Sequence, residues 1–92
     1  MLTAESLDLI KTCAREYGVG AVWLFGSSLE DEANAGDIDL AVEGIDPRRF
    51  FDFYGRLFFG LPKPVDLVNM SENLPIVSII RRTGVRIYGQ GS

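Results

Sequence analysis

Two aspartates separated by one residue, Asp37 and Asp39, are the side chains in this sequence best placed to do chemistry. If residues 37–43 form a β-strand, side chains alternate between its faces, so both carboxylates leave the same face. Two carboxylates aimed at one point repel each other unless a cation lies between them. Mg²⁺ held by carboxylates together with substrate phosphates is the usual arrangement in phosphoryl and nucleotidyl transfer. A solvated edge strand is the alternative explanation for such an acidic pair.

A turn before this pair and an aspartate after it favour the metal-binding interpretation. Gly26 has no Cβ and lets the backbone approach a phosphate closely, and Ser27 and Ser28 can offer donors to phosphate oxygens. A plain turn at the end of a strand is the alternative for Gly-Ser. Asp66 lies inside an apolar run, where a carboxylate is costly unless it is paired, hydrogen-bonded or coordinated. These residues predict carboxylates on two strands that face one cleft.

The composition restricts the possible chemistry. The chain has no histidine and one cysteine, which excludes Ser-His-Asp and Cys-His catalysis and histidine-based zinc sites within it. Oxygen ligands remain, and they favour Mg²⁺ or Mn²⁺. The net charge of −4 argues against direct DNA binding, which depends on basic patches. This negative charge suits a protein that binds cations or a basic partner.

Length and hydropathy predict a single domain over residues 1–92. With 47% apolar residues the chain can build a packed core. No apolar run reaches the length of a membrane span, and the N-terminus lacks the pattern of a secretory signal, so we expect a cytoplasmic protein. Cys13 falls on the apolar side of a predicted helix, where we expect a small core residue rather than a reactive thiol.

Periodicity and turn residues predict the order α-β-β-α-β-α-β, an α/β fold with a mixed sheet and helices packed on it. Thr3 is expected to cap the first helix, Asp46 the second with Pro47 at its first position, and Ser71 or Asn73 the third. The helices are expected over 4–17, 47–59 and 74–83, and the strands over 21–25, 37–43, 64–69 and 85–88.

The helix expected over 47–59 is apolar on more than one side. Phe53 and Leu57 belong to its main stripe, whereas Phe51 and Phe58 lie seven residues apart on another face. Complete burial of such a helix is difficult in a small domain, so we expect an interface with a second copy or another protein. The alternative is that Phe51 and Phe58 pack under the loop and the termini.

The order of Gly26-Ser27, the Asp37-x-Asp39 triplet and Asp66 resembles the nucleotidyltransferase superfamily of the DNA polymerase β type. The short length and the ending 80–88 resemble its smallest branch, the minimal nucleotidyltransferase (MNT) domains of bacteria and archaea. The resemblance runs from about residue 7 to residue 88 and implies a polymerase-β palm-like fold.

The same resemblance implies an activity and a partner. Asp37, Asp39 and Asp66 would be the catalytic and metal-binding residues, with Mg²⁺ or Mn²⁺ as the metal. The triphosphate of ATP or another nucleoside triphosphate would lie on the nucleotide-binding residues Gly26, Ser27 and Ser28. MNT domains are commonly paired with a helical HEPN-domain protein, for which they act as antitoxins that can transfer AMP to a tyrosine of the toxin.

One segment departs from the family pattern. An arginine-rich stretch generally follows Gly-Ser, but here the residues are Ser28-Leu29-Glu30-Asp31-Glu32, and acidic side chains beside a triphosphate are unfavourable. Either Mg²⁺ carries most of the phosphate binding, or arginines come from elsewhere. Arg48 and Arg49 are candidates, since cations at a helix N-terminus oppose the helix dipole, and a solvated helix face is the alternative.

Three functions are therefore compared. The first is a Mg²⁺-dependent nucleotidyltransferase, namely an adenylyltransferase acting on a protein. The second is a degenerate MNT domain that neutralises or tethers its partner by contact alone, which the acidic residues 30–32 favour. The third, a nucleotidyltransferase for tRNA ends or antibiotics, is disfavoured because those enzymes need further domains to hold the acceptor.

Overall fold

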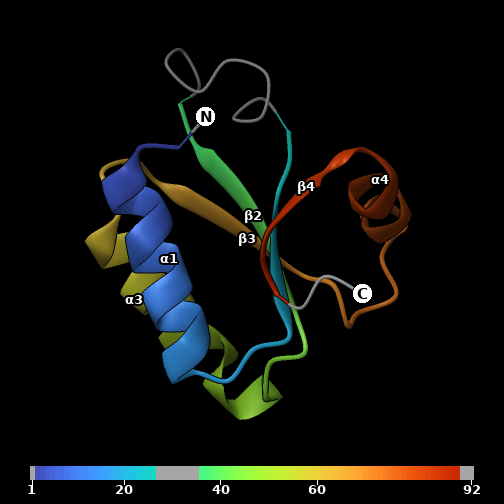
Figure 1. Cartoon of the computed structure of the whole chain (residues 1–92). Helices are drawn as coiled ribbons and strands as arrows, with labels where there is room; N and C mark the ends of the chain where they lie inside the picture. Colours follow the sequence, from blue (N-terminus) through green and yellow to red (C-terminus); the bar gives the residue numbers. More distant parts are fainter. Residues whose placement is uncertain (1, 27–35, 90–92) are drawn as a thin grey trace.

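The computed structural model describes residues 2–26 and 36–89, and within them every predicted element is present. The second helix differs in one respect, because it begins as a short 3₁₀ turn that leads into the α-helix (Figure 1). The elements are α1 (Ala4–Glu16), β1 (Ala21–Leu24), β2 (Ile38–Glu43), η1 (Pro47–Arg49), α3 (Phe50–Gly60), β3 (Val65–Asn69), α4 (Pro75–Thr83) and β4 (Val85–Gly89).

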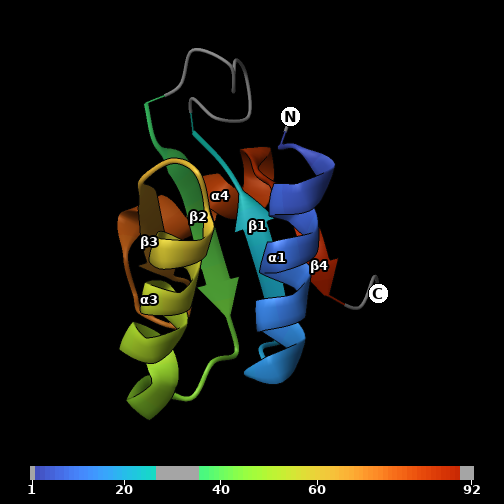
Figure 2. The same ribbon diagram turned by 90° about the vertical axis from the view of Figure 1, so that its left-hand side faces the viewer.

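The four strands form one mixed sheet in the order β3-β2-β1-β4. β1 runs antiparallel to both β2 and β4, whereas β2 and β3 run parallel because α3 carries the chain back between them. α1 and α3 cover one face of the sheet, and α4 lies on the other (Figures 1 and 2). The result is a three-layer α/β fold, as the sequence predicts.

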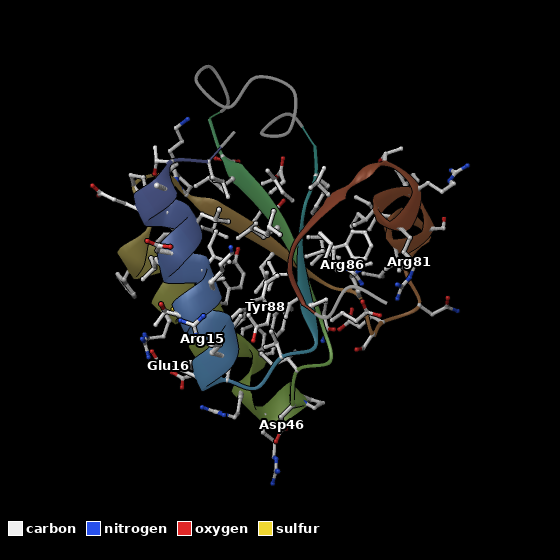
Figure 3. The ribbon with its side chains drawn as sticks, viewed as in Figure 1. Arg15, Glu16, Asp46, Arg81, Arg86 and Tyr88 are labelled. Carbon is white, nitrogen blue, oxygen red and sulfur yellow. The ribbon has the colours of Figure 1, made fainter. Side chains whose placement is uncertain are left out.

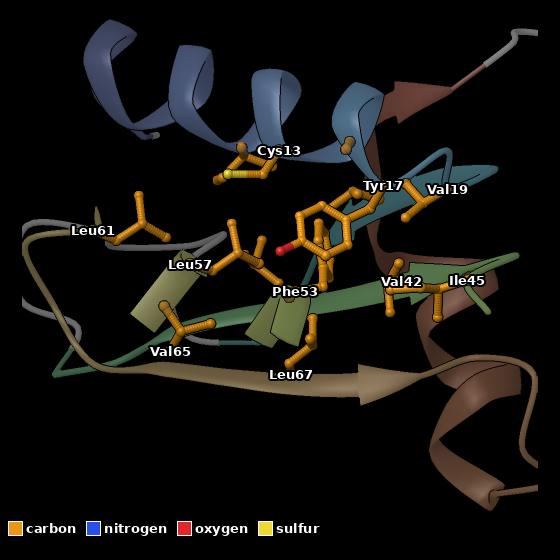
Figure 4. Packing of buried hydrophobic residues seen from close by; sticks show 14 of the residues in the cluster. Cys13, Tyr17, Val19, Val42, Ile45, Phe53, Leu57, Leu61, Val65 and Leu67 are labelled. Carbon is orange, nitrogen blue, oxygen red and sulfur yellow. The ribbon is translucent and has the colours of Figure 1, made fainter. Parts of the chain in front are cut away.

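The main core lies between the sheet and the α1–α3 layer (Figure 4). Alternation along β2 turns Ile38, Leu40 and Val42 toward the two helices, where all three are completely buried. Phe53 and Leu57 of α3 meet them and are also completely buried. The opposite face of β2 carries Asp39, Ala41 and Glu43.

Two of the predicted helix caps are confirmed. The Ser6 N–H donates to Thr3 Oγ1 at 3.1 Å, and the Arg48 N–H donates to Asp46 Oδ1 at 2.9 Å. Each bond satisfies a backbone donor that has no partner within the helix. The expectation for Cys13 is also confirmed, since it is a buried free cysteine.

The prediction that Ser71 or Asn73 caps the last helix is wrong. The N-cap of α4 is Leu74, which makes no side-chain capping bond, and Pro75 follows it inside the first turn. Proline brings no N–H, so this helix start has one fewer donor to satisfy. Ser71 instead donates its N–H to Asn69 Oδ1 at 3.0 Å in the preceding turn. Over residues 2–26 and 36–89, no helix is long and apolar enough to cross a membrane.

Candidate functional site

Gly26 lies directly against the side chain of Asp39. Leu24 is the register partner of Leu40, and the Phe25 N–H donates to the Asp39 carbonyl at 3.1 Å, so the turn after β1 begins beside the start of β2. A Cβ at position 26 would overlap the Asp39 carboxylate, and the backbone of Gly26 has a φ of +73°. Glycine is therefore required here for space and for backbone conformation.

Asp39 and Asp66 are paired residues on the parallel strands β2 and β3. Side chains of paired residues leave the same face of a sheet, and neighbouring strands lie about 4.8 Å apart. Asp39 is half-buried, whereas Asp66 is exposed. Two carboxylates thus lie side by side on the face that α1 and α3 leave open, and one of them, Asp39, also lies against Gly26.

The structure does not bring together the three-carboxylate group expected from the sequence. Asp37 is exposed and lies one residue before the start of β2. Over residues 2–26 and 36–89, no three Asp, Glu or Cys side chains are arranged so that they could hold a metal ion. The expected burial of Asp66 is wrong as well, because β3 is an edge strand of the sheet. Ser27 and Ser28, the expected phosphate donors, lie outside the described residues.

The donor set nonetheless fits a metal that binds together with a nucleotide. Mg²⁺ is usually held by one or two carboxylates, with substrate phosphates and water supplying the other ligands. Asp39 and Asp66 provide two such carboxylates from adjacent strands, and the absence of a Cβ at Gly26 leaves room for the Asp39 carboxylate against the turn. The arrangement is suited to a shared site, in which neither cation nor triphosphate binds tightly alone.

Of the two explanations for Arg48 and Arg49, the structure supports a solvated helix face and not phosphate contacts. They follow the C-terminal end of β2, whereas Asp39 lies at its beginning, and Asp46 marks that far end in Figure 3. Arg48 pairs with Asp46 at 3.0 Å and holds the pKa of that carboxyl below its usual range. The Arg49 guanidinium lies 4.2 Å from the centroid of the Tyr17 ring. Their contacts are those of a solvated helix start.

Lys63 is a basic residue near the site that sequence reasoning missed. The Ile38 N–H donates to the Pro64 carbonyl at 2.8 Å, which places the residues just before β3 beside the start of β2. Lys63 immediately precedes Pro64, at the same end of the sheet as Asp39 and Asp66. The sequence feature that could have indicated this residue is its position three residues before Asp66.

A salt bridge on the same face ties α4 to the sheet. Arg81 Nη2 lies 2.8 Å from Glu43 Oε2, and its hydrogen bond lowers the pKa of the Glu43 carboxyl. Arg86 of β4 lies 5.8 Å from the centroid of the Trp23 ring (Figure 3). Arg81 thus positions α4 over the far end of β2.

A mixed sheet with helices on both faces and paired aspartates beside a glycine turn is the arrangement expected of a nucleotidyltransferase-type domain. The family model described as Polymerase beta, Nucleotidyltransferase matches residues 8–92. The chain belongs to this polymerase-β nucleotidyltransferase family. No curated protein matches the sequence.

Solved structures support the fold. A toxin–antitoxin structure with AMP-PNP superposes with a TM-score of 0.75 at 22% identity, over 91% of this chain and 73% of the other. The toxin–antitoxin pair MntA–HepT gives 0.70 at 21% identity, over 92% and 71%. A Shewanella oneidensis complex of a tri-AMPylated HEPN toxin with an MNT antitoxin gives 0.66 at 23% identity, over 92% and 71%. At this identity the likeness establishes the shared fold.

Proposed function

We propose that the protein is a Mg²⁺-dependent nucleotidyltransferase that transfers AMP from ATP to a hydroxyl group. The observation that carries this proposal is the pairing of Asp39 with Asp66 beside the Gly26 backbone. Family membership supports the reaction class. We further propose that Asp37, which does not complete a three-carboxylate group in this structure, joins Asp39 and Asp66 once a cation is bound, and that Ser27 and Ser28 donate to the phosphates.

The proposed reaction is an in-line displacement at the α-phosphorus of ATP. The acceptor oxygen forms a bond to phosphorus while the bond to the bridging oxygen of pyrophosphate breaks. When bound, Mg²⁺ would offset the charge of the triphosphate and of the leaving pyrophosphate. Asp39, held in place against Gly26, would be the residue that holds the cation together with the triphosphate. Asp66, exposed at the sheet edge, accepts the proton of the acceptor hydroxyl.

The proposed acceptor is a tyrosine of a HEPN-domain partner. The printed descriptions of structural neighbours support this choice, since they include an AMP-PNP complex and an AMPylated HEPN toxin bound to an MNT antitoxin. The exposed position of Asp66 also fits an acceptor that is delivered by another protein, because a protein-borne hydroxyl can approach the edge strand from solvent. Transfer of AMP would then make this chain an antitoxin.

The test is transfer of α-labelled ATP to a HEPN-domain partner in the presence of Mg²⁺. The wild type should label the partner, and Asp39→Asn and Asp66→Asn should each lower the rate by at least about 10²-fold. Asp8→Asn is the matched control, because it removes the same charge from an exposed position on α1, across the sheet from the site. Equal labelling by all of these proteins would overturn the assignment of Asp39 and Asp66.

A second candidate function is inhibition of a partner by contact alone. It is favoured by the lack of a three-carboxylate group in the described part of the chain and by the acidic residues 30–32 of the sequence. Under this alternative, ATP does not bind with Mg²⁺, and Asp39→Asn binds and neutralises the partner as well as the wild type does.

A further inference from the structure

The outward face of α3 carries aromatic side chains that the described parts of the chain do not cover. Phe51 is 80% exposed and Phe59 is 89% exposed, and Phe58 beside it is 48% exposed. The inward face of the same helix already supplies the completely buried Phe53 and Leu57. The alternative that Phe51 and Phe58 pack under the loop and the termini involves residues outside the described ones, whereas residues 2–26 and 36–89 leave the outward aromatics available to another molecule.

Gly55 lies midway between the two most exposed phenylalanines. Phe51 is four residues before it and Phe59 four residues after it, so all three lie along one face of the helix. A Cβ at Gly55 would meet no atom within 4 Å, although glycine weakens a helix interior relative to alanine. Nothing in the described domain therefore requires glycine here, whereas a second helix approaching this face closely would require it.

The charged residues of α3 nearest this face are paired inside the domain. Asp52 accepts a hydrogen bond from the Tyr17 hydroxyl at 2.8 Å, and Arg56 pairs with Glu16 at 3.2 Å. Both residues are therefore held toward α1 and leave an apolar strip along the helix. An apolar strip without a charge pattern of its own suits a partner surface of the same kind better than a charged one.

We propose that this surface, Phe51, Gly55, Phe58 and Phe59, is the interface of a homodimer in which α3 packs antiparallel against α3 of a second copy. With a two-fold axis at Gly55, Phe51 of each copy meets Phe59 of the other, because the two aromatics are equally spaced on either side of the glycine. The surface is thus complementary to itself. This is the property that an interface between identical subunits requires.

The size of the surface predicts a reversible dimer. A phenylalanine buries on the order of 150–250 Å² when it is fully covered. Because these three are already partly covered within the domain, their exposed area supplies roughly half of the ~800 Å² per partner found in stable interfaces. Residues flanking the helix would add the remainder, and association should depend on concentration. α3 covers the face of the sheet opposite to α4, so the dimer leaves Asp39 and Asp66 accessible (Figures 1 and 2).

Sedimentation velocity of the full chain over a wide range of concentrations tests this inference. We expect the wild type to dimerise and Phe51→Ser/Phe59→Ser to remain monomeric at every concentration. Ile79→Ser is the matched control, since Ile79 is 49% exposed on α4 and its replacement should leave the dimer intact. Gly55→Ala should weaken association at least tenfold without lowering the thermal midpoint, because alanine favours the helix.

A monomeric wild type at all concentrations would overturn the homodimer and leave the surface to a different protein. A dimer that persists in Phe51→Ser/Phe59→Ser, or that Ile79→Ser dissociates, would overturn the choice of surface. Circular dichroism of each variant establishes that it is folded before its association state is compared.

Discussion

The Cα of Gly26 lies so close to the carboxylate of Asp39 that a Cβ at position 26 would overlap it. This contact joins the turn after β1 to the first acidic residue of β2, two segments separated by the loop. It fixes the Asp39 carboxylate between the turn after β1 and Asp66 on β3, because β2 lies between these two strands. The geometry of the proposed site rests on this contact.

Gly26→Ala should damage nucleotide binding more than it damages folding. A left-handed backbone costs alanine about 1–2 kcal/mol, and the new Cβ would also displace the Asp39 side chain. We expect the Mg²⁺-dependent affinity for ATP to fall at least tenfold, as measured by calorimetry.

Gly18→Ala is the control for this prediction. Gly18 has a φ of +64°, and a Cβ there meets nothing within 4 Å. It should therefore carry the same backbone cost without disturbing Asp39, and ATP should bind as it does to the wild type. Equal losses of ATP binding in the two variants would show that Gly26 acts only through stability.

Lys63→Ala should weaken ATP binding severalfold. Lys63 lies at the same end of the sheet as Asp39 and Asp66, and a nearby cation favours a bound triphosphate. The difference from the wild type should shrink as salt is added, because exposed charges are screened. Lys11→Ala is the matched control, because Lys11 lies on α1, across the sheet from the site. If Lys63→Ala binds ATP as tightly as the wild type does, this lysine takes no part in phosphate binding.

The salt bridge between Arg81 and Glu43 predicts a pH-dependent difference in stability. The lowered pKa of folded Glu43 means that its contribution is present above the unfolded-state pKa of about 4.3 and is lost as the pH falls through the folded-state value. Arg81→Ala should reduce the free energy of unfolding at neutral pH by less than about 1 kcal/mol, since both side chains are more than a third exposed.

Urea titrations at several pH values measure this difference. The difference in the free energy of unfolding between Arg81→Ala and the wild type should disappear at acidic pH. Arg82 lies in the same last turn of α4, so Arg82→Ala controls for the loss of a charge near the end of the helix dipole. If both variants lose the same free energy of unfolding relative to the wild type, and this loss does not change with pH, Glu43 has no specific role.

Most of the fold could be predicted because its signals are local. Thr3 and the Asp46-Pro47 pair mark helix starts through neighbouring backbone donors, and the alternation of Ile38, Leu40 and Val42 identifies the buried side of β2. The start of α4 was predicted to within one residue, but its cap was assigned wrongly because the observed cap, Leu74, has no capping side chain.

The site was only partly predictable because its geometry depends on the order of the strands. Sequence alone could not show that β3 is an edge strand, and this position is what leaves Asp66 exposed. The placement of Arg48 at the far end of β2 and of Lys63 at the near end follows from the parallel crossover through α3. Residue types alone made the arginines candidates for phosphate contacts, and the topology of the chain favours the lysine.

Calorimetric titration of ATP with and without Mg²⁺, on the wild type and on Asp39→Asn, tests the central claim most directly. The account predicts ATP binding that requires Mg²⁺ and that falls at least tenfold in Asp39→Asn, while Asp8→Asn binds as the wild type does. Binding that is independent of Mg²⁺, or that Asp39→Asn leaves unchanged, would contradict a shared metal–nucleotide site at Asp39. The absence of any ATP binding would contradict the enzyme and support a protein that acts on its partner by contact alone.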